Sequence, residues 1–116
     1  MTSLSHLHRA ARIRGLNDRF RADPDPVAAS ETFILTFGRI SLPYFIEQVR
    51  NYEGFTPGDD YAEHETGAFD VADHQVYWFI DYLTPDLRRP STDPADPAKT
   101  RRVLRFALAE ELNEAA

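Results

Sequence analysis

The sequence predicts a small α+β domain with the element order α-β-α-β-β-α. Two segments rich in aromatic and β-branched residues flank a short polar break near the middle of the chain, which is typical of a β-hairpin. Apolar residues recur at helical spacing near both ends. The 116 residues suffice for one hydrophobic core, so we expect 1–116 to be a single domain in which amphipathic helices pack against a small sheet.

Residues 4–22 are expected to form the first helix. Ile13, Leu16 and Phe20 fall on one apolar stripe, while most of the arginines lie outside it. The run that contains Pro24 and Pro26 must end this helix, because proline lacks the N–H donor and clashes with the preceding turn.

Residues 31–37 are dense in aromatic and β-branched side chains and are followed by Gly38, which predicts a strand. A second helix is expected at 42–53, because Ser41 suits the N-cap and Pro43 suits the first turn. Its apolar face comprises Leu42, Phe45, Ile46, Val49 and Tyr52.

The hairpin is predicted at 63–82, with Asp73 and His74 in its turn. Pairing Val71 with Val76 places Phe69 opposite Trp78. Alternation then directs one set of side chains to the core: Gly67, Phe69, Val71, Val76, Trp78, Ile80 and Tyr82. The other face carries His64, Thr66, Ala68, Asp70, Tyr77, Phe79 and Asp81.

A loop rich in proline and aspartate follows at 84–97. Asp96 is suited to an N-cap and Pro97 to a first helical position, so the last helix is expected at 97–113. Its apolar stripe comprises Val103, Leu104, Ala107, Leu108 and Leu112.

Composition and charge narrow the classes of function. The chain has no cysteine, which excludes disulfides and thiolate metal sites, and no apolar run approaches the roughly 20 residues that span a bilayer. We expect a cytoplasmic protein without a cofactor. The net charge is −6, and residues 23–98 alone have a balance of −11. Such a region repels nucleic acid and attracts a cationic protein surface.

Several short segments, taken together and in this order, resemble an uncharacterised bacterial family. They are Leu16-Asn17-Asp18-Arg19-Phe20, Phe55-Thr56-Pro57, Glu63-His64 with Gly67-Ala68-Phe69, Trp78 with Ile80-Asp81-Tyr82, Asp93-Pro-Ala-Asp-Pro97, Thr100-Arg-Arg-Val-Leu104 and Leu108-Ala-Glu-Glu111.

The family is a domain of unknown function found in short proteins, often on plasmids and other mobile elements, and the resemblance covers about residues 12 to 112. It usually has lysine at the position of Phe79 and a second tyrosine at that of Leu83. The resemblance implies that the gene lies on a mobile element, and it implies no established activity.

One candidate site for chemistry combines His64 and Asp81 with Glu63 or Glu65. In the predicted register His64 and Asp81 are diagonal neighbours on one face of the hairpin. A histidine with carboxylates can hold a divalent metal or act as a general base. The alternative is a polar sheet face with a histidine–aspartate hydrogen bond.

The stronger candidate is an acidic ridge, which we define as six carboxylates without an intervening lysine or arginine: Asp59, Asp60, Glu63, Glu65, Asp70 and Asp73. Carboxylates spaced in this way can imitate a row of phosphates. The alternative is an acidic face that only keeps the protein in solution. Tyr77 and Phe79 would be core residues beneath a helix, or aromatic anchors on a bare sheet face.

We therefore expect a non-enzymatic binding protein of a mobile element, which inhibits a host protein with a cationic surface such as a CRISPR or restriction component. No direct contact with nucleic acid or membrane is expected. The alternative is a small metal-dependent enzyme or ligand-binding domain that uses His64 and Asp81.

Overall fold

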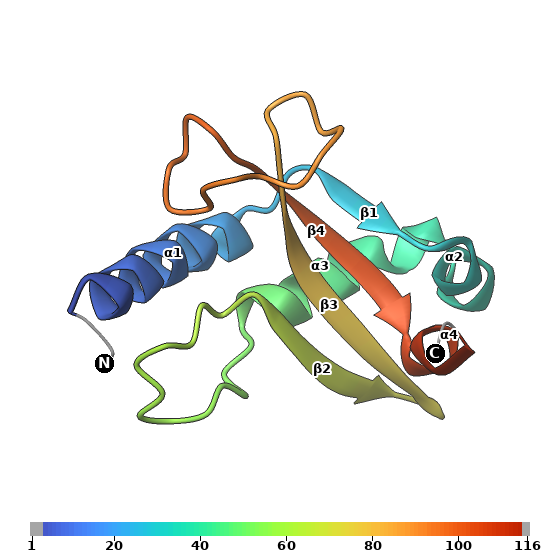
Figure 1. Cartoon of the computed structure of the whole chain (residues 1–116). Coiled ribbons are helices and arrows are strands. Elements are labelled where there is room, and N and C mark those ends of the chain that lie inside the picture. Colours follow the sequence, from blue (N-terminus) through green and yellow to red (C-terminus); the bar gives the residue numbers. More distant parts are fainter. Residues whose placement is uncertain (1–3, 115–116) are drawn as a thin grey trace.

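A four-stranded mixed sheet with the strand order β1-β4-β3-β2 forms the centre of the structure (Figure 1). Its strands are β1 (Val27–Ala29), β2 (Thr66–Val71), β3 (His74–Leu83) and β4 (Arg101–Leu108). Strand β4 is antiparallel to β3 and parallel to β1. The computed structural model describes residues 4–114, and it confirms the predicted α+β class.

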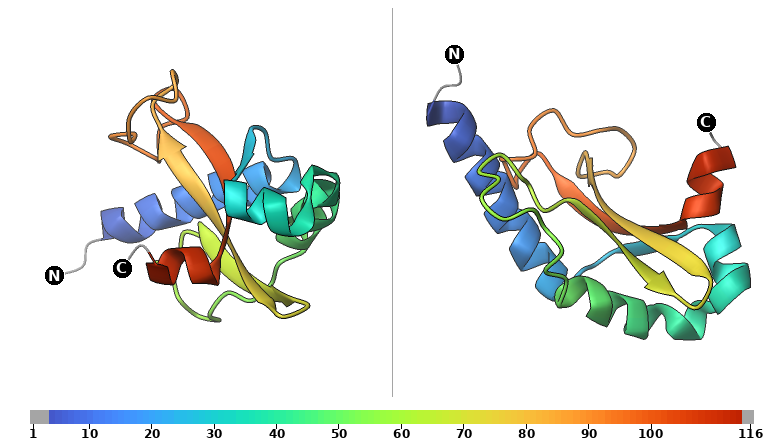
Figure 2. Two further views of the ribbon diagram at one scale, coloured as in Figure 1. Left: turned by 90° about the vertical axis from the view of Figure 1, so that its right-hand side faces the viewer. Right: turned by 90° about the horizontal axis from the view of Figure 1, so that it is seen from below.

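Three helices lie along one side of this sheet, as the right-hand view in Figure 2 shows. They are α1 (Leu4–Ala22), α2 (Glu31–Phe37) and α3 (Leu42–Arg50), with the short 3₁₀ turn η1 (Arg39–Ser41) between the last two. Helix α4 (Ala109–Glu114) lies on the other side. The loop 84–97 connects the ends of β3 and β4, and its residues Asp93 and Ala95 accept hydrogen bonds from Arg9 and Arg12 of α1. No helix within residues 4–114 combines the length and the apolar character needed to cross a membrane.

The core lies between α2, α3 and the inner face of the sheet. Trp78 of β3 and Phe106 of β4 are fully buried there. The ring of Phe33 in α2 packs 4.8 Å from that of Phe45 in α3 and 5.4 Å from that of Phe106, between ring centroids. Aromatic clusters of this kind bury large apolar areas, so they supply much of the driving force for folding.

The hairpin is present, but its register differs from the predicted one. Val71 lies opposite His74, and Phe69 lies opposite Val76, because the turn consists of residues 72 and 73. A shift of two residues leaves every side chain on the same face, since the side-chain period of a strand is two. The predicted inner face is therefore the one that packs on the helices.

The strand predicted at 31–37 is wrong, because this segment forms helix α2. Ser30 caps the helix by accepting a hydrogen bond of 3.1 Å from the backbone N–H of Phe33. Gly38 ends it with a φ of 79°, which glycine adopts readily. The caps and the burial of Phe33 outweigh the strand propensity of the segment.

The helix predicted at 97–113 is also wrong. Residues 101–108 form the central strand β4, and only Ala109–Glu114 is helical. Residues 93–99 form turns instead of a helix start, because Asp93 and Asp96 accept hydrogen bonds from N–H groups two residues ahead. Strand β4 is buried on both faces, so its apolar residues do not alternate with polar ones.

The remaining boundaries follow the sequence more closely. Helix α1 has the expected bounds, whereas α3 ends at Arg50 and not at residue 53. The short strand β1 had no counterpart in the sequence analysis.

Candidate functional site

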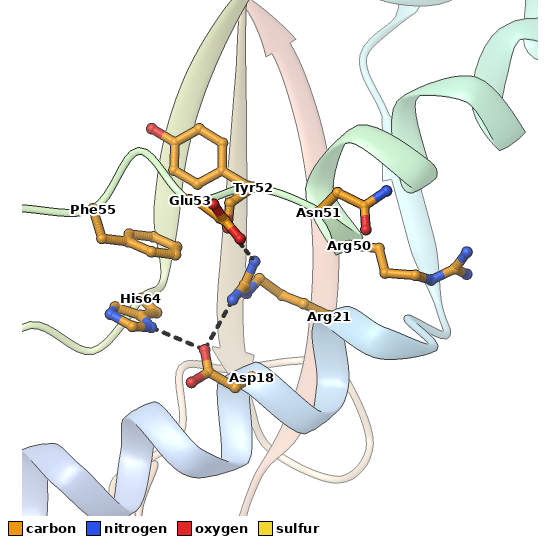
Figure 3. A pocket seen from close by; sticks show the side chains of 8 residues that line it. All are labelled: Asp18, Arg21, Arg50, Asn51, Tyr52, Glu53, Phe55 and His64. Atoms are coloured by element: carbon orange, nitrogen blue, oxygen red, sulfur yellow. Dashed lines mark hydrogen bonds and ion pairs between the residues drawn. The ribbon is translucent and has the colours of Figure 1, made fainter.

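A cleft of about 470 Å³, here called the large cleft, opens where the ends of α1 and α3 meet the connecting segment 51–65. Figure 3 shows that Asp18 and Arg21 project from α1 toward His64. The lining side chains are mostly polar or aromatic: Asp18, Arg21, Arg50, Asn51, Tyr52, Glu53, Phe55 and His64.

Arg21 forms the floor of this region and is only 8% exposed. Its guanidinium donates to the carbonyl oxygens of Val49 at 2.8 Å and Tyr52 at 3.4 Å, and to the carboxylate of Asp18 at 3.0 Å. A cation at the C-terminal end of α3 is favoured by the helix dipole. The Nε of Arg21 is buried and has no hydrogen-bond partner within the described residues.

Asp18 also accepts a hydrogen bond from His64, with 2.9 Å between Oδ1 and Nδ1, when Nδ1 carries the proton. Partial burial on its own raises the pKa of Asp18, but the hydrogen bonds and charges of His64 and Arg21 outweigh that effect. The pKa of Asp18 therefore lies below its ordinary value of 3.8. The carboxylate thus stays ionised and orients the imidazole.

The imidazole of His64 is held on its flat face as well. It stacks on Phe55 with 3.8 Å between ring centroids and 6° between the ring planes. The backbone of His64 has a φ of 58°, a left-handed conformation that is unfavourable for residues other than glycine and recurs at binding sites. His64 is therefore held at Nδ1 by Asp18 and on one ring face by Phe55.

A second opening of about 240 Å³, here called the small cleft, shares Phe55 and His64 with the large one. Its other lining residues include two carboxylates and two hydroxyl groups: Gly54, Thr56, Asp59, Ala62, Glu65 and Thr66. Nε2 of His64 makes no hydrogen bond within residues 4–114. An imidazole oriented by a carboxylate on Nδ1 can accept or donate a proton, or bind a ligand group, through Nε2.

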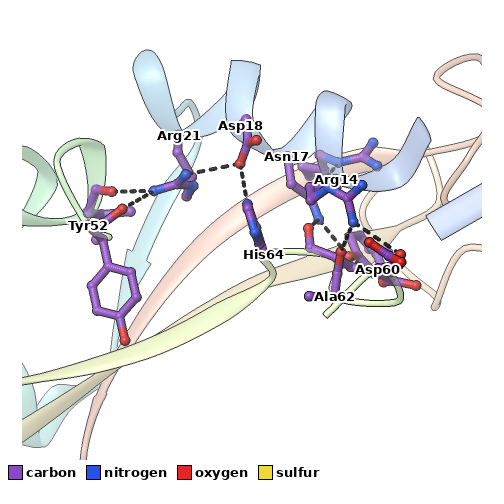
Figure 4. A network of polar contacts seen from close by, with 12 residues as sticks. Arg14, Asn17, Asp18, Arg21, Tyr52, Asp60, Ala62 and His64 are labelled. Atoms are coloured by element: carbon purple, nitrogen blue, oxygen red, sulfur yellow. Dashed lines mark hydrogen bonds and ion pairs between the residues drawn. The ribbon is translucent and has the colours of Figure 1, made fainter. Parts of the chain in front are cut away.

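A buried polar network supports the site from behind (Figure 4). Asn17 is fully buried, and its amide donates to the backbone carbonyl of Glu63 at 2.9 Å and to the hydroxyl of Tyr82 at 2.8 Å. The Tyr82 hydroxyl in turn donates to the carboxylate of Glu63 at 2.8 Å. Burial, reinforced by the nearby charge of Glu63, raises the pKa of Tyr82 above its ordinary value.

The predicted pair of His64 and Asp81 is not formed. Asp81 lies on the outer face of the sheet, where Arg105 donates to it at 2.8 Å, whereas His64 bonds to Asp18. His64 precedes β2 and has left the extended conformation, so the alternation assumed for the hairpin does not apply to it. Within residues 4–114 no group of three or more His, Cys, Asp or Glu is placed to hold a metal ion.

The acidic ridge is interrupted in the structure. Asp59 and Asp60 are exposed in the segment beside the small cleft, and Glu65 lines that cleft. Glu63 points inward to Tyr82, so it does not belong to the surface row. Asp70 is exposed near the hairpin turn, at the opposite end of β2.

Tyr77 and Phe79 are half-buried and alternate along β3 with the buried Val76, Trp78 and Ile80, so they lie on the outer face of the sheet. Their rings stack with 6.2 Å between centroids, and the guanidinium of Arg105 lies 4.4 Å from the centroid of Phe79. Arg105 therefore bridges Phe79 and Asp81 on this face.

Asn17, Asp18 and Arg21 were not among the site residues predicted from the sequence. A signal for two of them was present. The buried stripe of α1 consists of Ala10, Ile13, Asn17 and Arg21, and polar residues at apolar positions of a helix call for a buried partner. Asp18 carries no such signal, because it is exposed and its partner His64 is distant in sequence.

Segments that carried the resemblance meet at this site, since Asn17, Asp18, Phe55, Glu63 and His64 lie together in space. Comparison with curated proteins and with solved structures gave no match. A family model matches residues 32–111, which is more than half of the chain. The chain belongs to this family, described as proteins of unknown function (DUF3768).

Proposed function

We propose that the protein is a small, non-enzymatic binding module that recognises a cationic surface on another protein. The observation that carries this proposal is the group of Asp59, Asp60 and Glu65 at the small cleft. None of these side chains forms an ion pair with a cation within residues 4–114. Unpaired carboxylates of one sign create a field that attracts and orients a basic partner.

The small cleft suits a single basic side chain of such a partner. Asp59 and Glu65 supply carboxylates, Phe55 supplies an aromatic wall, and Thr56 and Thr66 supply hydroxyl groups. An arginine binds well in such surroundings, because its guanidinium forms paired hydrogen bonds with carboxylates and favourable contacts with aromatic rings.

For the partner itself, we propose a nucleic-acid-binding protein of a host defence system, such as a CRISPR or restriction component. Carboxylates can take the place of phosphates in a cationic groove. The mobile-element context implied by the resemblance supports the same proposal, and it would place the encounter in the cytoplasm. Asp70, Tyr77 and Phe79 would extend the contact along the hairpin and the outer sheet face.

Capture of partners from host lysate with tagged protein tests this proposal. The informative variant is Asp59→Asn/Asp60→Asn, and Asp23→Asn/Asp25→Asn is the matched control, because it removes two exposed carboxylates beyond the end of α1. We expect a stoichiometric nucleic-acid-binding partner for the wild type and the control, and its loss from the informative variant. Binding should weaken steeply as salt rises to about 0.5 M. Equal capture by all three proteins would contradict the proposal, as would capture of nothing above background.

A second candidate function is the binding of a small ligand beside His64. It is favoured by one observation, the fixing of His64 by Asp18 and Phe55 at the wall shared by the two clefts. In this ligand-binding function the carboxylate partner of His64 is Asp18, and not Asp81 as the sequence predicted. Thermal-shift screens with Mg²⁺, Mn²⁺, Zn²⁺ and small organic ligands test it. A shift that His64→Gln abolishes supports it, and a chelator identifies a metal-dependent form; no shift with any compound counts against it.

A further inference from the structure

Strand β2 has a free edge, which we define as its side away from β3. It is the outermost strand in the order β1-β4-β3-β2 (Figure 1). The strand at the opposite margin, β1, has only three residues and follows Pro26, whereas β2 has six residues and no proline. Short edge strands and prolines prevent the addition of a further strand to a sheet. Strand β2 has neither protection, so its free edge can accept a strand.

The register of the hairpin shows which backbone groups face the free edge. The backbone N–H of Ile80 donates to the carbonyl oxygen of Glu65 at 2.7 Å, so these two residues form a hydrogen-bonded pair. Such pairs recur at every second residue of an antiparallel ladder. The N–H and C=O groups of Thr66, Ala68 and Asp70 therefore point away from β3. Within residues 4–114 these groups have no hydrogen-bond partner.

The spacing of these unpaired groups selects one kind of ligand. Donors and acceptors that alternate along an edge, with a repeat of two residues, match the backbone of an extended peptide. Peptide recognition by strand addition uses such an edge, with the backbone supplying affinity and the side chains supplying specificity. The free edge therefore suits a peptide segment in the extended conformation.

The charges beside the free edge decide between possible segments. At its start, Thr66 also lines the small cleft, together with the carboxylates of Asp59 and Glu65. Near its other end Asp70 is exposed. None of these three carboxylates forms an ion pair with a cation within the part of the chain that the structure describes.

A second copy of β2 is a poor occupant of this edge. Both ends of the edge are acidic, so pairing two copies in either direction would bring like charges together, which is unfavourable across a strand pair. A segment with arginine or lysine near both of its ends is complementary to the edge in both backbone and charge.

We propose that β2 binds a basic, extended segment of the partner protein as an added strand, with one basic side chain in the small cleft and a second beside Asp70. This inference rests on the proposed function, because it states how the cationic partner would be bound. Glu65 and Asp70 are five positions apart. In a strand this separation is about 16 Å, so the two basic residues of the partner are about five positions apart as well.

Fluorescence anisotropy with the full chain and the labelled peptide Arg-Thr-Val-Thr-Val-Arg tests the proposal. The control peptide is Glu-Thr-Val-Thr-Val-Glu, which should bind roughly tenfold or more weakly, because its charges are repelled at both ends. A basic peptide that does not bind at about 1 mM overturns the proposal, as does equal binding of the two peptides.

Substitutions in β2 separate strand addition from simple charge attraction. Ala68→Pro removes one N–H from the free edge and none from the ladder with β3, so it should weaken binding of the basic peptide roughly tenfold. Ala68→Val retains this N–H and is the matched control. Asp70→Lys changes an exposed side chain and should also weaken binding. Wild-type affinity in a folded Ala68→Pro variant contradicts strand addition.

Hydrogen exchange of the wild type tests the added strand without any substitution. In the free protein the N–H groups of Thr66, Ala68 and Asp70 should exchange faster than that of Phe69, which lies in the ladder with β3. The basic peptide should slow exchange at the three outward groups. Bound peptide without protection of these groups overturns the proposal.

Capture from host lysate distinguishes this inference from the proposed function. A partner that Asp59→Asn/Asp60→Asn loses and Ala68→Pro retains contradicts the added strand and leaves the proposed function intact. If no partner is captured, the proposed function fails, and the peptide measurements still decide whether the edge accepts a basic strand. A wild type that dimerises in sedimentation velocity while Ala68→Pro stays monomeric would make a second copy the occupant, and would overturn the proposal.

Discussion

The side-chain oxygen of Asn17 accepts a hydrogen bond of 2.6 Å from Nε of Arg102, a residue 85 positions further along the chain. The amide group of the same asparagine donates to Glu63 and Tyr82. Burial lowers the pKa of Arg102 below its ordinary value, although its guanidinium has several partners, which include the carbonyl of Pro94 at 2.7 Å. One amide therefore joins α1 to β3, to β4 and to the segment before β2.

Replacement of Asn17 by alanine should lower the free energy of unfolding by about 2 to 4 kcal/mol, because it leaves a donor of Arg102 and an oxygen of Tyr82 without their partner in a buried region. Urea denaturation followed by the fluorescence of Trp78 measures the change. Arg19→Ala is the control on the exposed side of α1 and should stay within about 0.5 kcal/mol of the wild type. Equal stabilities for the two variants would refute this role of Asn17.

The pairing of Asp18 with His64 and Arg21 predicts how the free energy of unfolding changes with pH. Because the pKa of Asp18 is lower in the folded protein than the ordinary 3.8, its ionised form stabilises the fold at a pH above that value. This contribution is lost as the pH falls through the folded pKa. Wild type should therefore be more stable than Asp18→Asn at about pH 5, and the difference should shrink toward pH 2. Urea unfolding across this range measures it, and a difference that grows in acid contradicts the assignment.

The hairpin could be predicted because its pattern is repeated over many residues. Alternation in β3 places Val76, Trp78 and Ile80 on the buried face, and no helical spacing fits the same residues as well. The partners across the hairpin could not be fixed in the same way. A pairing of Val71 with Val76 and one with His74 present the same faces, and the choice depends on the turn.

The two misassigned elements show where local pattern is insufficient. Strand β4 lies between β1 and β3, so it is apolar on both faces, and residues such as Val103 and Ala107 fit a helical stripe equally well. Helix α2 is specified by the N-cap at Ser30 and the C-terminal Gly38. Each of these signals is a single residue, whereas the segment between them has the composition of a strand.

The site was only partly accessible from the sequence. His64 and the acidic segment could be selected by residue type, but the partner of His64 could not. Asp18 is 46 residues away, and the two meet because α1 packs beside the segment before β2. Such a pairing follows from tertiary structure and has no local signature.

The turn of the hairpin offers a stabilising substitution. Ala72 has a φ of 54°, at which its methyl group crowds the backbone. Glycine has no Cβ and adopts this φ readily. Ala72→Gly should therefore raise the free energy of unfolding by about 0.5 to 1 kcal/mol. Ala68→Gly, within β2 of the same hairpin, should lower it, because glycine weakens a regular strand. Thermal melts of both variants decide the matter, and a loss of stability in Ala72→Gly would speak against strain at this turn.

Replacement of glycine by alanine should have opposite effects on stability at Gly67 and at Gly15. A Cβ on Gly67 would lie 2.6 Å from Cζ of Tyr52 and 2.7 Å from Nε1 of Trp78, both closer than van der Waals contact permits. Gly67→Ala should therefore lower the free energy of unfolding by about 1 to 3 kcal/mol, as overpacking does.

At Gly15 nothing lies within 4 Å of an added Cβ, and the residue is inside helix α1. Gly15→Ala should raise the free energy of unfolding by about 0.5 to 1 kcal/mol, because alanine favours the helix and restricts the unfolded chain. Urea denaturation of both variants measures the two effects. If Gly67→Ala matched the wild type in stability, the close packing of Tyr52 and Trp78 against β2 would be wrong, and with it the rear wall of the large cleft at Tyr52.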